Sequence, residues 1–374
     1  MKKNGLKTSA LCEFLQDVVA PQADELDTQQ SIPKRLRDQA GEMNLWGICV
    51  PTEYGGIQLN AEDFSKVCMA TGKASGSLLS LLTIHSMVCA AISRWGTKQQ
   101  KQALLPELAS GRKLAAFAQS EPQVGCDVAN LQTVIEKSAH GYVINGVKKW
   151  ISGAQVADLF LVPGLHQGKP IALLVERATA GLEITAINDM LGFRAAMLGE
   201  ITLNNCQLSH DTLLGSEMFG LAQLVGSVLD VGRHAIACGA TGLAQACLQL
   251  STEYASRRKI DGKPMDQLQL VQQMLSDSAV QARAAMLMCM DAAKARDEGQ
   301  PDMIVKSSAA KYFASMTAKL AADNCVQILG AYGCSGESAA QRLFRDAKIF
   351  DIIEGSTQIQ QTLIAGEGEH WVFN

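Results

Sequence analysis

The residue best suited to chemistry in this sequence is a glutamate near the carboxyl end. Glu354 follows the apolar pair Ile352 and Ile353 and precedes Gly355. Apolar surroundings remove hydration from a carboxylate and raise its pKa, which suits a general base at neutral pH. Ser356 and the apolar stretch after it also resemble a helix start, where an acidic residue is stabilised by the helix dipole. These residues alone favour the helix-start interpretation.

Other patterns that would identify a chemistry are missing from the sequence. It contains neither the dinucleotide-binding pattern G-x-G-x-x-G nor the phosphate-binding pattern G-x-x-x-x-G-K-[ST]. The metal-binding pattern H-E-x-x-H and the hydrolase pattern G-x-S-x-G are absent too, and no metal site is expected. His85 lies in an apolar helical segment and is predicted to be a core residue. The glycines of Gly330–Gly336 are predicted to end a helix, although free backbone amides there could also meet a phosphate.

Length and composition describe a globular chain of two or three domains. Hydrophobic residues make up 47% and charged residues 19%, which excludes extensive disorder. The net charge of −4 gives no basis for binding nucleic acid, which requires a basic surface. Eleven cysteines without a C-x-x-C pair indicate buried, reduced thiols. No signal peptide is apparent, and no apolar run approaches the ~20 residues that span a bilayer. We therefore predict a cytoplasmic protein that does not bind a membrane.

Hydrophobic periodicity divides the chain into three parts of an α+β multidomain protein. Residues 1–112 show the three- and four-residue spacing of helices, with helical patterns at residues 61–73, 78–95 and 98–109 among them. The segment Ser77–Cys89 is apolar almost all round, so its helix is predicted to be central and buried. Residues 113–212 contain short β-forming runs, which predict a small antiparallel β domain. Within it, Asn145-Gly146 predicts a hairpin turn. Residues 213–374 carry long apolar stripes joined by short polar breaks, which predict an antiparallel four-helix bundle.

Motifs in a fixed order run through nearly the whole chain. They are Val50–Gly56, Gly96–Lys101, Phe117–Pro122, Gly125–Asp127, Asn145–Gly153, Leu191–Arg194, Tyr254–Arg258, Gly262–Pro264 with Gln269, and Ile353–Gln360. Each is weak by itself, whereas the ordered set is specific, and together they resemble the acyl-CoA dehydrogenase family of flavoproteins. The order of helices, strands and helices found from periodicity agrees with the fold of that family.

The resemblance implies FAD-dependent α,β-dehydrogenation of an acyl thioester, carried by coenzyme A or by an acyl-carrier protein. In the family, the glutamate that matches Glu354 removes the α-proton while the β-hydride passes to the flavin. An α-C–H is a very weak acid, so the site must stabilise enolate charge on the thioester carbonyl, as an oxyanion hole does. Family members use the amide of the residue that matches Glu354 and a ribityl hydroxyl of FAD. With the motifs included, the catalytic interpretation of Glu354 is preferred.

Five residues match positions that contact the flavin ring system. Phe117, Gln119 and Ser120 match the segment along the isoalloxazine, where Ser120 can bond its pyrimidine edge. Trp150 and Ser152 match a pair whose ring packs on the flavin and whose hydroxyl reaches the reactive nitrogen. By itself, Trp150 would be interpreted as an ordinary aromatic residue of a sheet core.

Seven further residues match other FAD contacts: Arg258, Gln269, Gln327, Gly330, Gly333, Ser356 and Gln358. The first two match residues that hold the diphosphate and adenosine, and an arginine paired with phosphate makes strong charge-assisted bonds. By itself, Arg258 would be a solvated charge on a helix. Gln327 and the two glycines match a contribution from a neighbouring subunit, which implies a homodimer or homotetramer. Ser356 and Gln358 match contacts beside the base.

Three residues match positions near the thioester arm of the substrate. Asp230 and Arg233 match an Asp-x-x-Arg pair beside the pantetheine. Cys126 stands where the family often has serine, and a thiol is the weaker hydrogen-bond partner. An acyl-carrier protein in place of coenzyme A is therefore an expected variant. Asp261 replaces a phenylalanine that packs near the adenosine in the family, and a carboxylate close to the diphosphate would weaken FAD binding by repulsion.

Two alternatives to the dehydrogenase stay open. One is a monooxygenase of the same fold that uses reduced flavin and oxygen, although such relatives usually lack a base matching Glu354. The other is a non-catalytic relative without flavin, which the substitution at Asp261 suggests. A dehydrogenase would also need an electron acceptor, which in this family is an electron-transfer flavoprotein or another carrier.

Overall fold

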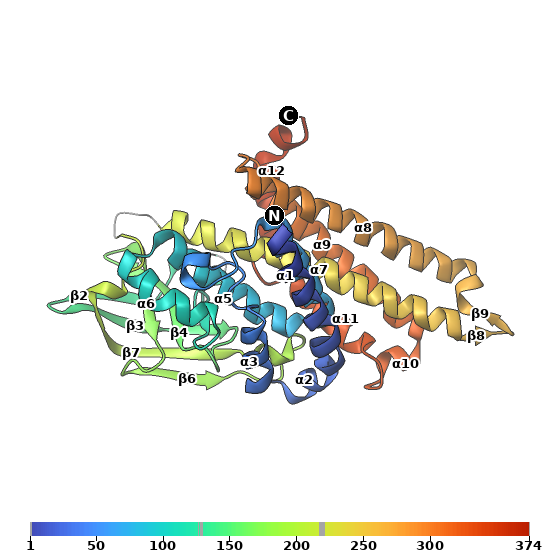
Figure 1. Ribbon diagram of the computed structural model, residues 1–374, viewed down its shortest axis with the longest axis horizontal. Coiled ribbons are helices and arrows are strands. Elements are labelled where there is room, and N and C mark those ends of the chain that lie inside the picture. Colours follow the sequence, from blue (N-terminus) through green and yellow to red (C-terminus); the bar gives the residue numbers. More distant parts are fainter. Residues whose placement is uncertain (1, 126, 128–129, 217–220, 374) are drawn as a thin grey trace.

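The computed structural model describes residues 2–125, 127, 130–216 and 221–373, which fold into a helical part, a sheet and a long helical bundle (Figure 1). The amino-terminal helices are α1 (Lys2–Phe14), α2 (Ala23–Gln29), α3 (Lys34–Glu42), α4 (Ala61–Ala74), α5 (Gly76–Trp95) and α6 (Lys98–Ala109). The carboxyl-terminal helices are α7 (Leu221–Arg257), α8 (Gln269–Glu298), α9 (Met303–Leu329), α10 (Ala331–Cys334), α11 (Ala340–Phe350) and α12 (Thr357–Phe373).

Polar side chains cap the starts of helices α4, α5 and α6. The side chain of Asn60 accepts a hydrogen bond at the start of α4, and that of Ser75 does so at the start of α5. Thr97 and Gln100 form a reciprocal capping box at the start of α6. The carboxylate of Asp297 on α8 accepts from two further amides of α4, the nearer at 2.7 Å. This last cap also ties the amino-terminal helices to the bundle.

Helix α5 is the central element of the molecule. It is 20 residues long, and an 18-residue window within it has a mean hydropathy of 1.6. By length and composition it could therefore span a membrane, contrary to the expectation that no run approaches this. In the fold, 89% of that apolar window is buried, and α5 packs against α7 and the sheet. His85 is a core residue as predicted. Its Nδ1 accepts from the amide of Ala115, and burial lowers its pKa to about 4.

The strand-rich part forms one seven-stranded sheet. Its strands are β1 (Ala115–Phe117), β2 (Val134–Ser138), β3 (Gly141–Ile151), β4 (Leu159–His166), β5 (Lys169–Glu176), β6 (Leu182–Ala186) and β7 (Gly199–Ser209). Their order is β1-β4-β2-β3-β7-β6, with β5 paired to β4. Pairing is antiparallel except where β4 runs parallel to β1 and β2. The strands lie within residues 115–209, and the domain boundaries at 112/113 and 212/213 stay predictions.

The predicted Asn-Gly hairpin is wrong. Asn145 and Gly146 lie inside β3, and the turn between β2 and β3 occupies residues 139–140. The register with β7 shifts at this point, and the amide of Asn205 donates to Oδ1 of Asn145 at 2.7 Å. A Cβ on Gly146 would lie 2.5 Å from Oγ1 of Thr133. Asn145 and Gly146 therefore form a β-bulge, which increases the twist of β3. The dipeptide alone does not show whether it belongs to a bulge or to a turn.

The carboxyl-terminal part is the predicted four-helix bundle, built from α7, α8, α9 and α11. Helix α4 packs against α7 so closely that a Cβ on Gly72 would collide with Gly239. One hydrophobic core joins the amino-terminal helices to the bundle, and a second lies between the sheet, α5 and α6. After α7 a short hairpin of β8 (Lys259–Ile260) and β9 (Lys263–Pro264) projects from the end of the bundle that is remote from the sheet (Figure 1). The predicted α+β fold class is confirmed.

Candidate active site

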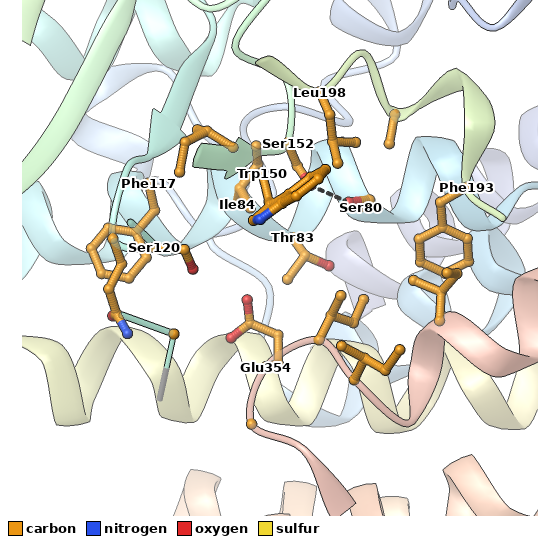
Figure 2. A pocket seen from close by; sticks show the side chains of 18 of the residues that line it. Ser80, Thr83, Ile84, Phe117, Ser120, Trp150, Ser152, Phe193, Leu198 and Glu354 are labelled. Carbon is orange, nitrogen blue, oxygen red and sulfur yellow. Dashed lines mark hydrogen bonds between the residues drawn. The ribbon is translucent and has the colours of Figure 1, made fainter. Parts of the chain in front are cut away.

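A cavity of about 650 Å³ lies where α5, the sheet, α7 and the segment after α11 meet. It collects side chains that are far apart in the sequence, from each of the three parts of the chain (Figure 2). Seven of the residues predicted for the site line it: Phe117, Gln119, Ser120, Trp150, Ser152, Arg233 and Glu354. The fold thus brings together the predicted base and the predicted contacts of the flavin ring.

Glu354 occupies a strained turn between α11 and α12. Its φ is +55° and that of Gly355 is +88°, and the left-handed conformation costs a non-glycine residue roughly 1–3 kcal/mol. Figure 2 shows the carboxylate directed into the cavity, towards Thr83. Helix α12 begins only at Thr357. The carboxylate therefore faces a cavity and does not cap a helix, which contradicts the helix-start interpretation.

The surroundings of the Glu354 carboxylate favour its protonated form. Its Oε2 is buried and has no hydrogen-bond partner among the described residues. Burial raises the pKa of Glu354 to about 7, while the positive charges of Arg233 and Lys311 act in the opposite direction. Such a pKa leaves the group about half ionised at neutral pH, which is suitable for a general base.

Gly232 on α7 makes room for the base and was missed in the sequence. A Cβ at this position would collide with Oε2 of Glu354 and lie 2.6 Å from its Cδ. The only available signal was a glycine inside a long helical pattern, where it costs helix stability and so suggests a packing reason. The carboxylate fits between α5 and α7 because this position has no side chain.

Trp150 faces the cavity and is not a core aromatic. Its side chain is 50% exposed, and its φ of +62° is rare for a bulky residue. The register between β3 and β7 shifts between Lys148 and Ile151, and this irregularity turns the indole towards the cavity. Beside it, the hydroxyls of Ser80 on α5 and Ser152 are hydrogen-bonded at 3.0 Å (Figure 2).

A buried ion pair holds the segment that carries Gln119 and Ser120. Nζ of Lys148 lies 2.7 Å from Oε1 of Glu121 and donates to the carbonyl of Gln119 at 3.2 Å. The amide of Lys149 donates to the carbonyl of Ser120 at 2.9 Å. Burial lowers the pKa of Lys148 to about 8, although the bonds to Glu121 oppose this. Both charged residues stand within the family motifs, but their pairing could not be inferred from spacing.

The two residues of the predicted Asp-x-x-Arg pair have different surroundings in the structure. Arg233 lines the cavity, and its Nε has no partner among the described residues. Asp230 is buried but does not line the cavity, because its carboxylate is ion-paired with Arg296 on α8. Cys126, the third predicted substrate contact, lies outside the described residues. Of the two described residues of this set, only Arg233 is placed where it could meet a ligand.

The other predicted FAD contacts do not line the cavity of their own chain. Ser356 and Gln358 belong to the turn after Glu354 and the start of α12. The remaining five gather at the remote end of the bundle, where α7 ends, α8 begins and α9 is followed by α10: Arg258, Gln269, Gln327, Gly330 and Gly333. At this end the rings of Tyr254 and Tyr332 stack at 5.7 Å.

Asp261 stands at the tip of the β8–β9 hairpin. Its φ is +50° and that of Gly262 is +80°, as in a type I′ turn, where an Asp-Gly pair is favoured. The residue is exposed and remote from the cavity of its own chain. Turn geometry thus gives a physical reason for an aspartate at this position. It weakens the interpretation of Asp261 as a sign of lost flavin binding.

Known proteins are similar to this chain in sequence and in fold along nearly its whole length. Family models described as the N-terminal, middle and C-terminal domains of acyl-CoA dehydrogenase match residues 8–112, 116–206 and 220–368. The probable acyl-CoA dehydrogenase YngJ of Bacillus subtilis (strain 168) is 36% identical over 360 residues, covering 94% of each chain.

Solved structures of other proteins are similar to this chain at TM-scores above 0.9, and two of them are informative here. Butyryl-CoA dehydrogenase from Megasphaera elsdenii has a TM-score of 0.93 and 29% identity, covering 98% of each chain. The prolyl acyl carrier protein oxidase AnaB has a TM-score of 0.92 and 25% identity, covering 98% of each chain. Enzymes of the matched family are oxidoreductases that dehydrogenate acyl thioesters and depend on FAD, so the expected cofactor is confirmed. This chain belongs to the acyl-CoA dehydrogenase family.

Proposed function

We propose that this protein is an acyl-thioester dehydrogenase in which Glu354 removes the α-proton of the substrate. The observation that carries the proposal is the buried carboxylate, directed into a cavity that it shares with Trp150 and Ser152. The acyl carrier is coenzyme A or an acyl-carrier protein. Butyryl-CoA dehydrogenase and the carrier-protein oxidase, both similar to this chain, are named for these two kinds of substrate.

The residues around the cavity fit a flavin. The indole of Trp150 offers a flat apolar surface, and the hydroxyl of Ser152 stands two residues further along the chain. Oε1 of Gln119 is buried without a partner among the described residues, which costs roughly 1–3 kcal/mol unless a ligand supplies a donor. When bound, FAD supplies the hydride acceptor of the reaction.

The side chain and the backbone amide of Glu354 can each contribute to removal of the α-proton. The ionised Glu354 carboxylate takes the proton, and its raised pKa makes it a stronger base than an exposed glutamate. None of the described residues accepts a hydrogen bond from the amide of Glu354. This N–H is therefore available to the thioester carbonyl, where charge develops as the proton leaves. Apolar side chains of α5, α7 and the segment before Glu354 keep water from the α-carbon.

A second copy of the chain completes the proposed FAD site. The five residues at the remote end of the bundle cannot reach the cavity of their own chain, so a homodimer or homotetramer would place them on the diphosphate and adenosine of a neighbour. The proposed location is the cytoplasm. An electron-transfer flavoprotein, or another acceptor, would reoxidise the enzyme.

The proposal is tested with the variant Glu354→Gln. We expect the purified variant to retain FAD, because the amide is nearly isosteric. Its flavin should not be bleached by any member of panels of acyl-CoA and acyl-carrier-protein substrates that bleach the wild type. A wild-type rate of bleaching in the variant would refute Glu354 as the base. The panel that bleaches the wild type identifies the carrier.

A further inference from the structure

Lys311 on α9 is a buried cation to which the proposed reaction gives no role. The residue is 0% exposed, and its Nζ donates a hydrogen bond to the carbonyl oxygen of Gly355 at 2.7 Å. Burying an ammonium group costs several kcal/mol unless it is paired and hydrogen-bonded. The hydrogen bond to Gly355 places this charge directly behind the turn that carries the base.

Gln360 on α12 also holds this turn. It is also 0% exposed, and its Nε2 donates to the carbonyls of Glu354 at 3.1 Å and Gly355 at 3.2 Å. Two buried side chains from different helices thus hold the two carbonyls of a turn whose residues both have positive φ. A strained backbone persists only where its surroundings hold it in this way.

Two cations, from two helices, act on the carboxylate of Glu354. Arg233 on α7 and Lys311 on α9 both favour its ionised form, against the effect of burial. Arg233 reaches into the cavity, whereas Lys311 lies behind the turn and is bonded to its backbone. Only Lys311 therefore combines a charge with a direct hold on the chain at Glu354.

Among the described residues, two acidic groups near the cavity are neutralised by lysines. Glu121 of the sheet lines the cavity but is neutralised by Lys148. Asp351, at the end of α11, is ion-paired with Lys319 and Lys348. The lining residues from α5 and β3 are uncharged. Removing the charge of Lys311 should therefore leave Arg233 as the main counter-charge to the base.

We propose that Lys311 is a positioning residue for Glu354: it holds the Gly355 carbonyl, so fixing the turn that presents the carboxylate, and it places a positive charge directly behind that turn. This inference rests on the proposed role of Glu354. Without Lys311, burial would dominate, and the carboxylate would stay protonated up to a higher pH. The turn would also lose one of the two donors that hold it in the left-handed conformation.

The test is a titration of the Glu354 carboxyl in the FAD-loaded protein, followed by ¹³C NMR with labelled glutamate and assigned with Glu354→Gln. We expect Lys311→Met and Lys311→Gln to raise the pKa of Glu354 by roughly one unit, the effect of losing one nearby opposite charge. Lys311→Arg, which keeps the charge and a donor, should titrate like the wild type. The acid limb of substrate-driven flavin reduction should move to higher pH by the same amount in the first two variants.

Lys306→Met is the matched control. Lys306 lies on the same helix but pairs with Asp291 and Asp302, outside the cavity, so its loss should leave the titration unchanged. An unchanged pKa of Glu354 in a folded, FAD-containing Lys311→Met protein would overturn the inference. If Lys311→Met does not fold, the same titration is carried out on Lys311→Gln, which retains a hydrogen-bond donor, and an unchanged pKa of Glu354 there would overturn the inference. The titration needs no substrate, so it tests the role of Lys311 independently of the reaction. If no substrate reduced the flavin, that result would contradict the proposed function but not the proposed role of Lys311.

Discussion

At the scale of single residues, the site depends on where one carboxylate is placed. Glu354 is surrounded by apolar side chains, and its Oε2 has no partner among the described residues. Burial alone would hold it protonated, so the cations Arg233 and Lys311 are needed to bring its pKa to about 7. The pKa of the base is thus set by burial, which raises it, and by two cations on different helices, which lower it.

Gly232 gives a prediction at this scale. In Gly232→Ala the new methyl group would displace the Glu354 carboxylate, and a misplacement of about 1 Å lowers the rate of flavin reduction roughly a hundredfold. Alanine favours a helix over glycine, but its methyl group would also press on Sδ of Met87, so retention of FAD and of thermal stability is measured alongside the rate to separate loss of rate from loss of fold. Stopped-flow absorbance of the flavin measures the rate. Gly226→Ala on the same helix, where the Cβ would enter open space, is the control. An equal rate in both variants would contradict this role of Gly232.

At the scale of elements, irregular strands and paired charges shape the flavin side of the cavity. The register shift in β3 exposes Trp150, and the ion pair between Glu121 and Lys148 fixes the segment after β1. Neither the register shift nor the ion pair can be predicted from strand propensity. A strand without the shift would bury the indole in the sheet, as the composition of β3 alone suggests.

The ion pair can be tested by removing one partner. Glu121→Gln leaves Lys148 buried and unpaired, so the free energy of unfolding should fall by roughly 3 kcal/mol and FAD should dissociate more readily. Chemical denaturation and flavin fluorescence measure the two effects. Because Lys113 and Glu176 form an exposed pair, Glu176→Gln should cost less than about 1 kcal/mol. Equal destabilisation in the two variants would mean that the buried pair has no special role.

At the scale of the whole molecule, one chain carries two separate groups of predicted FAD contacts. The cavity lies between the sheet, α5 and the bundle, and the second group lies around Arg258 at the remote end of the bundle (Figure 1). Both groups serve one cofactor only if copies of the chain associate. The proposed assembly is thus a requirement of the proposed site.

Mixed assemblies test this requirement. Arg258→Ala should weaken FAD binding, whereas Arg257→Ala, in the neighbouring exposed residue, should not. When Arg258→Ala and Glu354→Gln chains are unfolded and reassembled together, some cavities should combine an intact Glu354 with an intact Arg258 from another copy. Substrate-driven bleaching should then return in the mixture, although neither variant alone supports it. Failure to recover bleaching in assemblies proven to be mixed would contradict a site shared between copies.

The sequence by itself determined the order of elements and the family. Periodicity located the helices near residues 61–73, 78–95 and 98–109 to within a few residues, because apolar spacing and caps are local properties. The family motifs and the Asp-x-x-Arg pair identified seven of the residues that line the cavity, since they place particular side chains at fixed positions along the chain. The same local reasoning failed at Asn145-Gly146, because a bulge and a turn both need a glycine and only the partner strand distinguishes them.

The tertiary structure decided what surrounds each of these residues. Whether Glu354 caps a helix or faces a cavity depends on Gly232, Lys311 and Gln360, which lie on three other elements and were not singled out in the sequence. Asp230 and Arg233 are three residues apart, yet only one of them reaches the cavity, since Arg296 holds the other. Burial, and with it the pKa of a base, is a property of contacts between distant segments, so it emerges only when the chain is folded.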